Sequence, residues 1–403
     1  MPARAVLAVF FAAAVTFGAP SVASAQAVQR SGATFHVPVC PGPAAAGTAR
    51  CHAHLVTDSR GSPLKGPPVA GVSYTASQLR NAYGVVYSST TPQGPLIAVV
   101  DAYDYPTAES DLKAYRSKMG LPSCTSSTGC FTKMDQTGGS NYPKSNLGWS
   151  QEAALDLDMV SAMCPTCRIL LVEANSANFV DLATAVQMAG AYGPAAISNS
   201  YGGGETGSAT YAPAYVNPTG VVTASTGDNG YGVSFPASAP TVVGVGGTSL
   251  KQAGGGWSET AWAGAGSGCS SVYARPSFQN PAVSNAVSSS TCSKRAVADV
   301  SAVADPNTGV QVYGPSRTGS GWLVFGGTSV GAPLIAGVFG AGAIEGVTPD
   351  VGNPYSAWGS DPTALNDVTS GSNGSCGGTA LCTAKSGWDG PTGLGSPNGP
   401  GAF

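Results

Sequence analysis

Residues 325–333, FGGTSVGAP, join a strand-like apolar run, WLVFGG at 322–327, to a helix-like run, LIAGVFGAGAIEG at 334–346. A serine at such a junction, here Ser329, is a candidate nucleophile. A serine hydroxyl is weakly nucleophilic and needs a neighbouring base, usually histidine. The chain has only three histidines, all within residues 36–54. The sequence therefore raises the question of which group accepts the proton of Ser329.

Apolar strand-like runs alternate with helix-like runs along most of the chain. Besides 322–327, the expected strands are 96–101, 168–174, 195–200, 220–228 and 241–247. The expected helices are 109–120, 150–164, 179–193 and the one after Ser329. Continuous apolar strands between helices are typical of a buried parallel sheet with helices on both faces. We predict an α/β fold, with residues 73–403 forming one domain of catalytic size.

The amino end reads as an export signal. Arg4 precedes an apolar run, and Ala23-Ser24-Ala25 fits a signal-peptidase site, so we assign residues 1–25 to a signal peptide. A buried amino-terminal helix is the weaker alternative, because no polar residue repeats through the run. No later stretch offers about 18 uninterrupted apolar residues, so the mature protein is expected to be soluble and extracellular.

Residues 26–72 form an amino-terminal extension that is rich in Pro and Gly and shows little periodicity. The runs CPGPAAAGTARC and DSRGSPLKGPP indicate loop and linker. The histidines His36, His52 and His54 all lie in this extension, outside the expected catalytic region.

Ten cysteines agree with an oxidising compartment. We predict five local disulfides, although spacing alone does not determine the connectivity. The predicted pairs are Cys40–Cys51, Cys124–Cys130, Cys164–Cys167, Cys269–Cys292 and Cys376–Cys382. A redox role for the Cys-Pro-Thr-Cys run is disfavoured, because no thioredoxin-like context surrounds it. A metal site of Cys40, Cys51, His52 and His54 is the alternative to a plain disulfide with bystander histidines, which we favour.

The composition excludes one class of partner. Charged residues make up 10% of the chain, against about 25% in an average protein, and the net charge is −3 with no basic run. Nothing therefore suggests nucleic-acid binding. Few charges also mean little self-repulsion when carboxylates are protonated, which suits an acidic medium. An adhesive cell-wall or matrix protein can equally have such a low content of charged residues.

Two carboxylates are the best candidates for the missing base. The cysteines are expected to be oxidised, and no lysine lies at a clear strand end. Glu152 and Asp156 are four residues apart and share one face of the helix expected at 150–164, with Ser150 as its N-cap. Their neighbours are mostly apolar, which argues against the alternative of a solvated acidic face. Two close carboxylates in an apolar setting share a proton, so Glu152 can accept the proton of Ser329 while Asp156 holds it in position.

Asp228, in STGDNG at 225–230, follows a buried strand in a Gly-flanked turn. Strand ends of α/β sheets present ligand groups at such places. A protonated aspartate in an apolar site can donate a hydrogen bond to the oxyanion of an acyl-transfer reaction. An ordinary turn is the alternative, and it is favoured when this stretch is taken alone.

Together GGTSVGAP, EAALD and STGDNG resemble the sedolisin family, the serine-carboxyl peptidases. The likeness extends in the family's order over residues 73–399. It implies a subtilisin-like three-layer sandwich, with a mostly parallel central sheet flanked by helices. It also implies that Ser329 is the nucleophile, Glu152 the general base, Asp156 its partner and Asp228 the oxyanion donor. Asp101 and Tyr201 occupy positions where some relatives extend this network.

The resemblance also implies one structural calcium ion near the carboxyl end. Calcium prefers six or more hard oxygen ligands. The resemblance places as ligands Asp367, the carbonyl of Val368, the carbonyl of Gly387 and Asp389. A lone Asp-Gly turn is usually only a turn. Cys376–Cys382 would close the loop between these ligands.

The sequence thus predicts a secreted endopeptidase that acts at acid pH on protein or peptide substrates. We expect a monomer without nucleic-acid or membrane partners. The alternative is a catalytically silent, calcium-stabilised binding or surface protein on the same scaffold. A neutral subtilisin-type protease is excluded, because it needs a catalytic histidine and the three histidines lie outside the expected catalytic region. Relatives usually carry a large folded propeptide, whereas only about 47 residues separate the signal from the catalytic-like region here.

Overall fold

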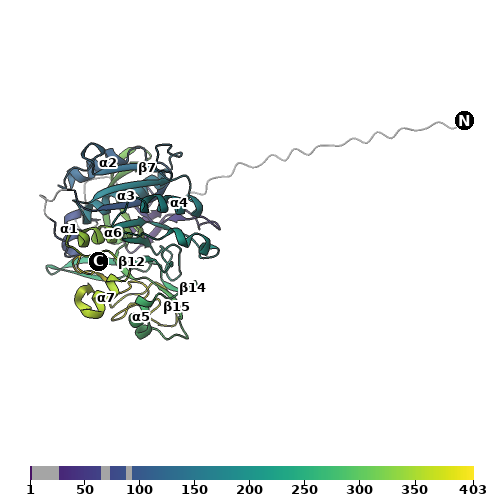
Figure 1. Cartoon of the computed structure of the whole chain (residues 1–403), viewed down its shortest axis with the longest axis vertical. Helices are drawn as coiled ribbons and strands as arrows, with labels where there is room; N and C mark the ends of the chain where they lie inside the picture. The colour runs from purple at the N-terminus through teal and green to yellow at the C-terminus, as the bar shows by residue number, and fades with distance from the viewer. Residues whose placement is uncertain (2–26, 65–72, 88–92) are drawn as a thin grey trace.

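The computed structural model describes residues 27–64, 73–87 and 93–403 together with Met1 (Figure 1). Its central feature is an eight-stranded sheet. In spatial order the strands are β13 (Gly256–Ala261), β12 (Val242–Ala253), β11 (Val221–Ser225), β9 (Ala196–Asn199), β6 (Leu96–Ala102), β8 (Arg168–Ala174) and β7 (Phe131–Asp135), and β16 (Val300–Val303) also pairs with β12. Neighbouring strands are parallel except β12 and β13. The predicted mostly parallel sheet is confirmed.

Helices flank this sheet. Helix α6 (Thr328–Ile344) packs on β9, β11, β12 and β16, and α3 (Leu147–Met163) packs against α6. Helix α4 (Phe179–Gly190) packs on β6, β8 and β9. The remaining α-helices of the described residues are α1 (Ala76–Ala82), α2 (Ala108–Lys118), α5 (Asn280–Ala286) and α7 (Asn353–Ser360). The α/β class, with helices around a mostly parallel sheet, is therefore confirmed.

Helix α3 begins one turn before its predicted N-cap. The side chain of Asn146 accepts a hydrogen bond from the Trp149 amide at 3.2 Å, so Asn146 is the N-cap. The prediction of Ser150 is wrong, because Asn146 is also a capping residue type and lies earlier. The hydroxyl of Ser150 instead donates to the carbonyl oxygens of Asp104 and Asn146. Because α3 lies against both α6 and β17 (Gly309–Ser316), nearly its whole surface is buried.

A second, six-stranded sheet contains the described part of the amino-terminal extension. Its order is β1 (Gln29–Ser31), β2 (Thr34–Pro38), β4 (His54–Thr57), β18 (Gly319–Gly326), β17 and β5 (Ser73–Tyr74). The loop prediction for 26–72 is therefore wrong for these strands. The strand at 322–327 belongs to this mostly antiparallel sheet and not to the parallel one. A continuous apolar run shows burial but does not identify its partner.

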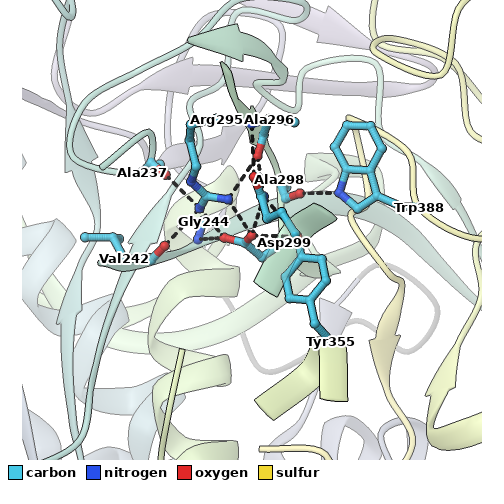
Figure 2. Close-up of polar contacts among 10 residues, drawn as sticks. Ala237, Val242, Gly244, Arg295, Ala296, Ala298, Asp299, Tyr355 and Trp388 are labelled. Atoms are coloured by element: carbon cyan, nitrogen blue, oxygen red, sulfur yellow. Dashed lines mark hydrogen bonds and ion pairs between the residues drawn. The ribbon is translucent and has the colours of Figure 1, made fainter. Parts of the chain in front are cut away.

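A buried ion pair connects the carboxyl-terminal region to the sheet (Figure 2). Arg295 Nη1 lies 2.6 Å from Asp299 Oδ1, and Nη2 bonds the other carboxylate oxygen. The hydroxyl of Tyr355 in α7 donates to the same carboxylate at 2.7 Å. The indole of Trp388 donates to the Ala298 carbonyl at 2.9 Å. These bonds join β12, β15 (Lys294–Val297), α7 and the last loop of the chain.

All five predicted disulfides are present, and no cysteine of the described residues is free. The predicted signal segment lies outside the described residues apart from Met1. Within the described ranges, no helix combines the length and the apolar character needed to cross a bilayer.

Candidate active site

Ser329 lies in the first turn of α6, directly after β18. Gly327 makes the turn between the two elements with a φ of 98°, in the left-handed region that favours glycine. The Ser329 side chain is buried, and its Oγ donates to the carbonyl oxygen of Ser200 at 3.1 Å. The strand-to-helix junction thus holds this hydroxyl at the end of β9.

Glu152 and Asp156 lie one turn apart on α3, and both are completely buried. Glu152 Oε2 accepts a hydrogen bond from the Ala53 amide at 3.1 Å. Asp156 Oδ1 accepts one from Ser200 Oγ at 2.7 Å. Ser200 therefore contacts two of the predicted site residues, since its carbonyl binds Ser329 and its hydroxyl binds Asp156. The alternative of a solvated acidic face is excluded by the burial of both carboxyls.

Burial dominates the protonation of this pair. It raises the pKa of Glu152 well above its usual range, and Asp101 raises it further, while contact with the Ser329 hydroxyl favours the charged form. Burial, then Asp101, then Glu152 raise the pKa of Asp156. Glu152 Oε1 and Asp156 Oδ2 are buried without a hydrogen-bond partner among the described residues. The pair therefore shares a proton at pH values where exposed carboxyls have lost theirs, which leaves one carboxylate of the pair able to act as a base.

Asp101, near the end of β6, is the third acid of the cluster. It is buried, and neither of its carboxyl oxygens has a hydrogen-bond partner within the described ranges. Burial and then Glu173 raise its pKa well above the usual range. Tyr201 is oriented differently, because its hydroxyl donates to Asn199 Oδ1 at 2.7 Å. Asp101 thus raises the pKa of both Glu152 and Asp156, whereas Tyr201 makes no hydrogen bond to these acids.

Asp228 lies just beyond β11 and faces the start of α6. Its Oδ1 accepts hydrogen bonds from the Thr328 amide at 2.8 Å and from Thr328 Oγ1 at 2.7 Å. Burial raises the pKa of Asp228 to about 7, although the bonds from Thr328 oppose this rise. Its Oδ2 makes no hydrogen bond to any described residue and lies 3.4 Å from His54 Nε2. A neutral Asp228 can therefore present an O–H donor beside Ser329.

His52 and His54 lie at the site, so the prediction that the histidines fall outside the catalytic region is wrong, whereas Cys40 and Cys51 form the plain disulfide that was favoured over a metal site. His54 Nδ1 lies 2.9 Å from His36 Nδ1, and His52 Nδ1 lies 2.7 Å from Ser225 Oγ. Burial lowers the pKa of all three, to about 3 for His54. None of them hydrogen-bonds Ser329 in the described structure. His54 is a neighbour of Asp228 and His52 a neighbour of β11, and Glu152 remains the group that contacts the Ser329 hydroxyl.

Sequence reasoning also missed Ser200 and Ala53. Ser200 is the last residue of the strand predicted at 195–200 and directly follows the observed β9, but serines at strand ends are common and carry no special signal. The contact of Ala53 with Glu152 joins residues 99 positions apart. No local sequence pattern predicts a contact between residues so far apart in the chain.

Three of the four residues proposed to bind calcium lie together in the carboxyl-terminal loops, namely Asp367, Gly387 and Asp389. Asp367 Oδ2 accepts a hydrogen bond from the Gly387 amide at 2.9 Å. Asp389 accepts from Thr392 and from the Lys385 amide, and burial raises its pKa, with Asp367 adding a smaller rise. The two carboxylates lie close enough to repel each other, which suits a cation between them. Both of them, however, already accept hydrogen bonds from neighbouring groups. Among the described residues, no three His, Cys, Asp or Glu side chains form a metal-binding group.

No protein-family model matches the sequence. Among curated proteins, the chain is 30% identical over 366 residues to kumamolisin of Bacillus sp. (strain MN-32), which covers 82% of this chain and 63% of kumamolisin. It is 36% identical over 182 residues to sedolisin of Pseudomonas sp. (strain 101), which covers 41% of this chain and 29% of that protein. The chain therefore spans less than two thirds of the length of these relatives.

A solved structure agrees with these matches. Pseudomonas sedolisin, a serine-carboxyl proteinase complexed with two molecules of pseudo-iodotyrostatin, aligns with a TM-score of 0.68 at 25% identity. The alignment covers 82% of this chain and 96% of that one.

Proposed function

Because the chain belongs to the sedolisin family, with its subtilisin-like fold, we propose that it is a serine-type endopeptidase that acts at acid pH. The observation that carries this proposal is the buried hydroxyl of Ser329, which lies among carboxyls and has no histidine bonded to it. Ser329 is the nucleophile, Glu152 the general base, Asp156 its partner and Asp228 the oxyanion donor. The substrates are proteins or peptides.

The reaction runs through an acyl-enzyme. Glu152 takes the proton of Ser329 as Oγ attacks the scissile carbonyl carbon. The carbonyl oxygen becomes an oxyanion, which accepts a hydrogen bond from neutral Asp228. Glu152 then gives the proton to the leaving amine, the C–N bond breaks, and water releases the acyl group by the reverse sequence. Asp156, bonded to Ser200 Oγ, fixes the position of Glu152 and shares its proton.

Acid pH follows from the oxyanion donor. Asp228 has to be neutral to donate, and burial raises its pKa to about 7. Below that pH the donor is present, and above it the carboxylate would repel the developing oxyanion. Activity is therefore confined to the acid side of neutrality.

One observation favours the rival function, a silent binding protein on the same scaffold. Groups of the chain's own amino-terminal segment already contact the proposed base and oxyanion donor, at Ala53 and His54 respectively. A site filled in this way would bind no substrate.

Secretion and calcium complete the proposal. Five disulfides suit an oxidising compartment, and we assign residues 1–25 to the export signal, with the peptidase domain at 73–403. One calcium ion is held by Asp367 and Asp389 together with the carbonyls of Val368 and Gly387. When bound, this ion supplies structural charge neutralisation and takes no part in the chemistry. The protein acts as a monomer.

Incubation of the purified protein with a denatured protein substrate across pH 3 to 8 tests the proposal. Cleavage confined to the acid side is the expected result. No cleavage at any pH in this range would favour the binding scaffold, and cleavage strongest at pH 8 would contradict the role of Asp228.

A further inference from the structure

Glu173 is a buried acid that the proposed mechanism does not use. It lies in β8 directly opposite Asp101 of β6, its register partner in the parallel sheet. Neighbouring strands lie about 4.8 Å apart, and the side chains of register partners leave the same face of the sheet. Both residues are only 1% exposed. The buried acids of the candidate site therefore continue from Asp101 to Glu173.

The two carboxyl oxygens of Glu173 have different surroundings. Oε1 accepts a hydrogen bond from the Tyr105 amide at 2.8 Å and lies 3.1 Å from Lys133 Nζ. Oε2 is buried without a hydrogen bond to any described residue, and the same holds for both oxygens of Asp101. A proton on Glu173 would therefore sit on Oε2, because Oε1 already accepts from two donors.

Lys133 has another carboxylate as its counter-ion. Its ammonium group has three hydrogens, and its three acceptors are Asp104 Oδ1, the Tyr105 carbonyl oxygen at 2.9 Å and Glu173 Oε1. The side chain of Asp104 is 17% exposed, whereas that of Glu173 is 1% exposed. A negative charge costs less where water reaches it, so Asp104 balances the charge of Lys133. Glu173 can then accept from Lys133 as a neutral acid, through its carbonyl oxygen.

The protonation of Glu173 agrees with this geometry. Burial raises the pKa of Glu173 to about 8, although the Tyr105 amide and Lys133 oppose the rise. Asp135 of β7 is the register partner on the other side, and hydrogen bonds from its own turn, that of the Thr137 hydroxyl above all, lower its pKa to about 2. At pH 4 Glu173 is therefore neutral while Asp135 is ionised. The titratable groups on β8 and on the elements packed against it are Arg168 of β8, Asp101 of β6, Asp104 after β6, Lys133 and Asp135 of β7, Tyr142 after β7, Glu152, Asp156 and Asp158 of α3, and Asp181 of α4.

The loop after β6 is held in a strained conformation beside Glu173. Tyr103 has a φ of 67°, in the left-handed region that few residues other than glycine adopt. Its amide donates to the Ala174 carbonyl oxygen at 2.8 Å, and two residues later the Tyr105 amide reaches Glu173. Strained backbone persists only where its surroundings hold it, and it is enriched at functional sites. The loop thus fixes the donor that occupies Oε1.

We propose that Glu173 is a positioning residue of the catalytic acids, whose neutral carboxyl donates a hydrogen bond from Oε2 to Asp101. This inference rests on the proposed function and deepens it. Glu152 Oε1 and Asp156 Oδ2 also have no partner among the described residues, and Asp101 raises the pKa of both acids. Asp101, Glu152 and Asp156 therefore titrate as one group. A donor at the end of this group stabilises the negative charge that Glu152 needs to act as the base.

The direction of the effect follows from this charge. A hydrogen bond donated to a carboxylate favours its ionised form, so the donor lowers the pH at which the acid group first ionises. Ionisation of the group supplies the base, and kcat/KM falls at pH values below it. Loss of the donor should therefore move this acid-side fall to higher pH. If Glu173 were ionised instead, loss of its negative charge would move the fall to lower pH.

Two variants of Glu173 test the proposal, through kcat/KM on one denatured protein between pH 3 and 8. Glu173→Met keeps the approximate size of the side chain but has no donor. We expect its acid-side fall to move up by about one pH unit, the effect of a hydrogen bond to a charged group, with kcat/KM about tenfold lower at pH values below the fall. Glu173→Gln keeps an acceptor for Tyr105 and Lys133 and an N–H donor for Asp101. Its pH profile should match that of the wild type.

Glu259→Met supplies a matched control. Glu259 is a hydrogen-bonded acid of β13, at the opposite end of the eight-stranded sheet. Its bonding partners are the side chains of Tyr83, Thr248 and Ser396, which lie outside the candidate site. The same substitution there should lower the melting temperature and leave the acid-side fall of kcat/KM where it is in the wild type.

An infrared measurement tests the protonation of Glu173 without catalysis. The spectrum of the wild type minus that of Glu173→Gln at pH 6 should contain the C=O stretch of one protonated carboxyl and no carboxylate stretch. A carboxylate stretch in this difference spectrum would overturn the proposal. This measurement also decides the matter if Glu173→Met does not fold.

The outcomes separate this inference from the proposed function. An acid-side fall that is unmoved or shifted to lower pH in Glu173→Met overturns the inference and leaves the peptidase standing. A Glu173→Gln profile that follows Glu173→Met instead of the wild type also overturns it. If the wild type cleaves no protein between pH 3 and 8, the proposed function fails, and with it the base that Glu173 would serve.

Discussion

At the residue scale, the position of Asp228 decides what its carboxyl can do. Both hydrogen bonds that it accepts, from the amide and the hydroxyl of Thr328, go to Oδ1. Its Oδ2 is left beside His54 and the His52 carbonyl without a hydrogen bond to any described residue, so a proton on Asp228 would sit on this free oxygen. A raised pKa means that the proton is present below about pH 7 and lost above it.

Asp228→Asn should therefore change the shape of the pH profile as well as its height. The amide keeps a donor that does not titrate, so the variant should be less active at pH 4 yet decline less steeply as the pH rises through 7. Asp228→Ala removes the donor and should cost about 10²- to 10³-fold in kcat. The measurement is kcat/KM against pH for the three proteins. If kcat/KM of Asp228→Asn fell with rising pH as steeply as that of the wild type, a group other than Asp228 would control the loss of activity at high pH.

At the element scale, the strands and helices of the parallel sheet were predictable from apolar runs and helical periodicity. The pairing of β18 was not, because burial of a strand does not reveal which strand lies beside it. The amino-terminal strands β1 to β4, of which β3 is Arg50–Cys51, were not predicted from the sequence, for a related reason. They are short, rich in polar residues, and stabilised by partners such as β18, some 270 positions later in the chain.

Loss of one member of the buried pair of Arg295 and Asp299 should destabilise the fold strongly (Figure 2). Arg295→Met leaves the Asp299 carboxylate buried without its counter-charge, and losing one partner of such a pair costs about 3–5 kcal/mol. Urea unfolding followed by fluorescence should show this loss. Arg317→Met, at an exposed arginine, should change stability by no more than about 0.5 kcal/mol. Equal effects of the two variants would contradict the importance of the pair.

At the scale of the whole molecule, the candidate site is assembled from segments far apart in the sequence. The carboxyls Glu152 and Asp156 were identifiable because their spacing and apolar neighbours are local features. The placement of His52, Ala53 and His54 was not, because it depends on the extension crossing the ends of β9 and β11. Composition alone made that extension look like a linker, although the amides of His52 and Ala53 both donate hydrogen bonds there, to the Ser200 carbonyl and to Glu152 Oε2.

Calcium removal should loosen the carboxyl-terminal loop between Asp367 and Asp389. A ligand that binds only the folded state adds RT ln(1 + [L]/Kd), about 2.7 kcal/mol at a hundredfold excess over Kd. A chelator at pH 5 should therefore lower the melting temperature by several degrees. In Asp389→Ala, which lacks a ligand, the chelator should have no further effect. An unmoved melting curve together with no calcium by elemental analysis would show that this site does not exist.

The most direct test of the account compares the initial rates of wild type, Ser329→Ala and Glu152→Gln on one denatured protein at pH 4. The account predicts that each substitution lowers kcat by at least about 10²-fold, the usual contribution of a general base, while the melting temperatures of the variants stay near that of the wild type. Glu152→Gln keeps the size of the side chain and its acceptor for the Ala53 amide, so lost packing cannot explain its effect. If Glu152→Gln retained more than about a tenth of the wild-type rate, or if Ser329→Ala still cleaved the substrate, the carboxylate-assisted serine mechanism would be contradicted.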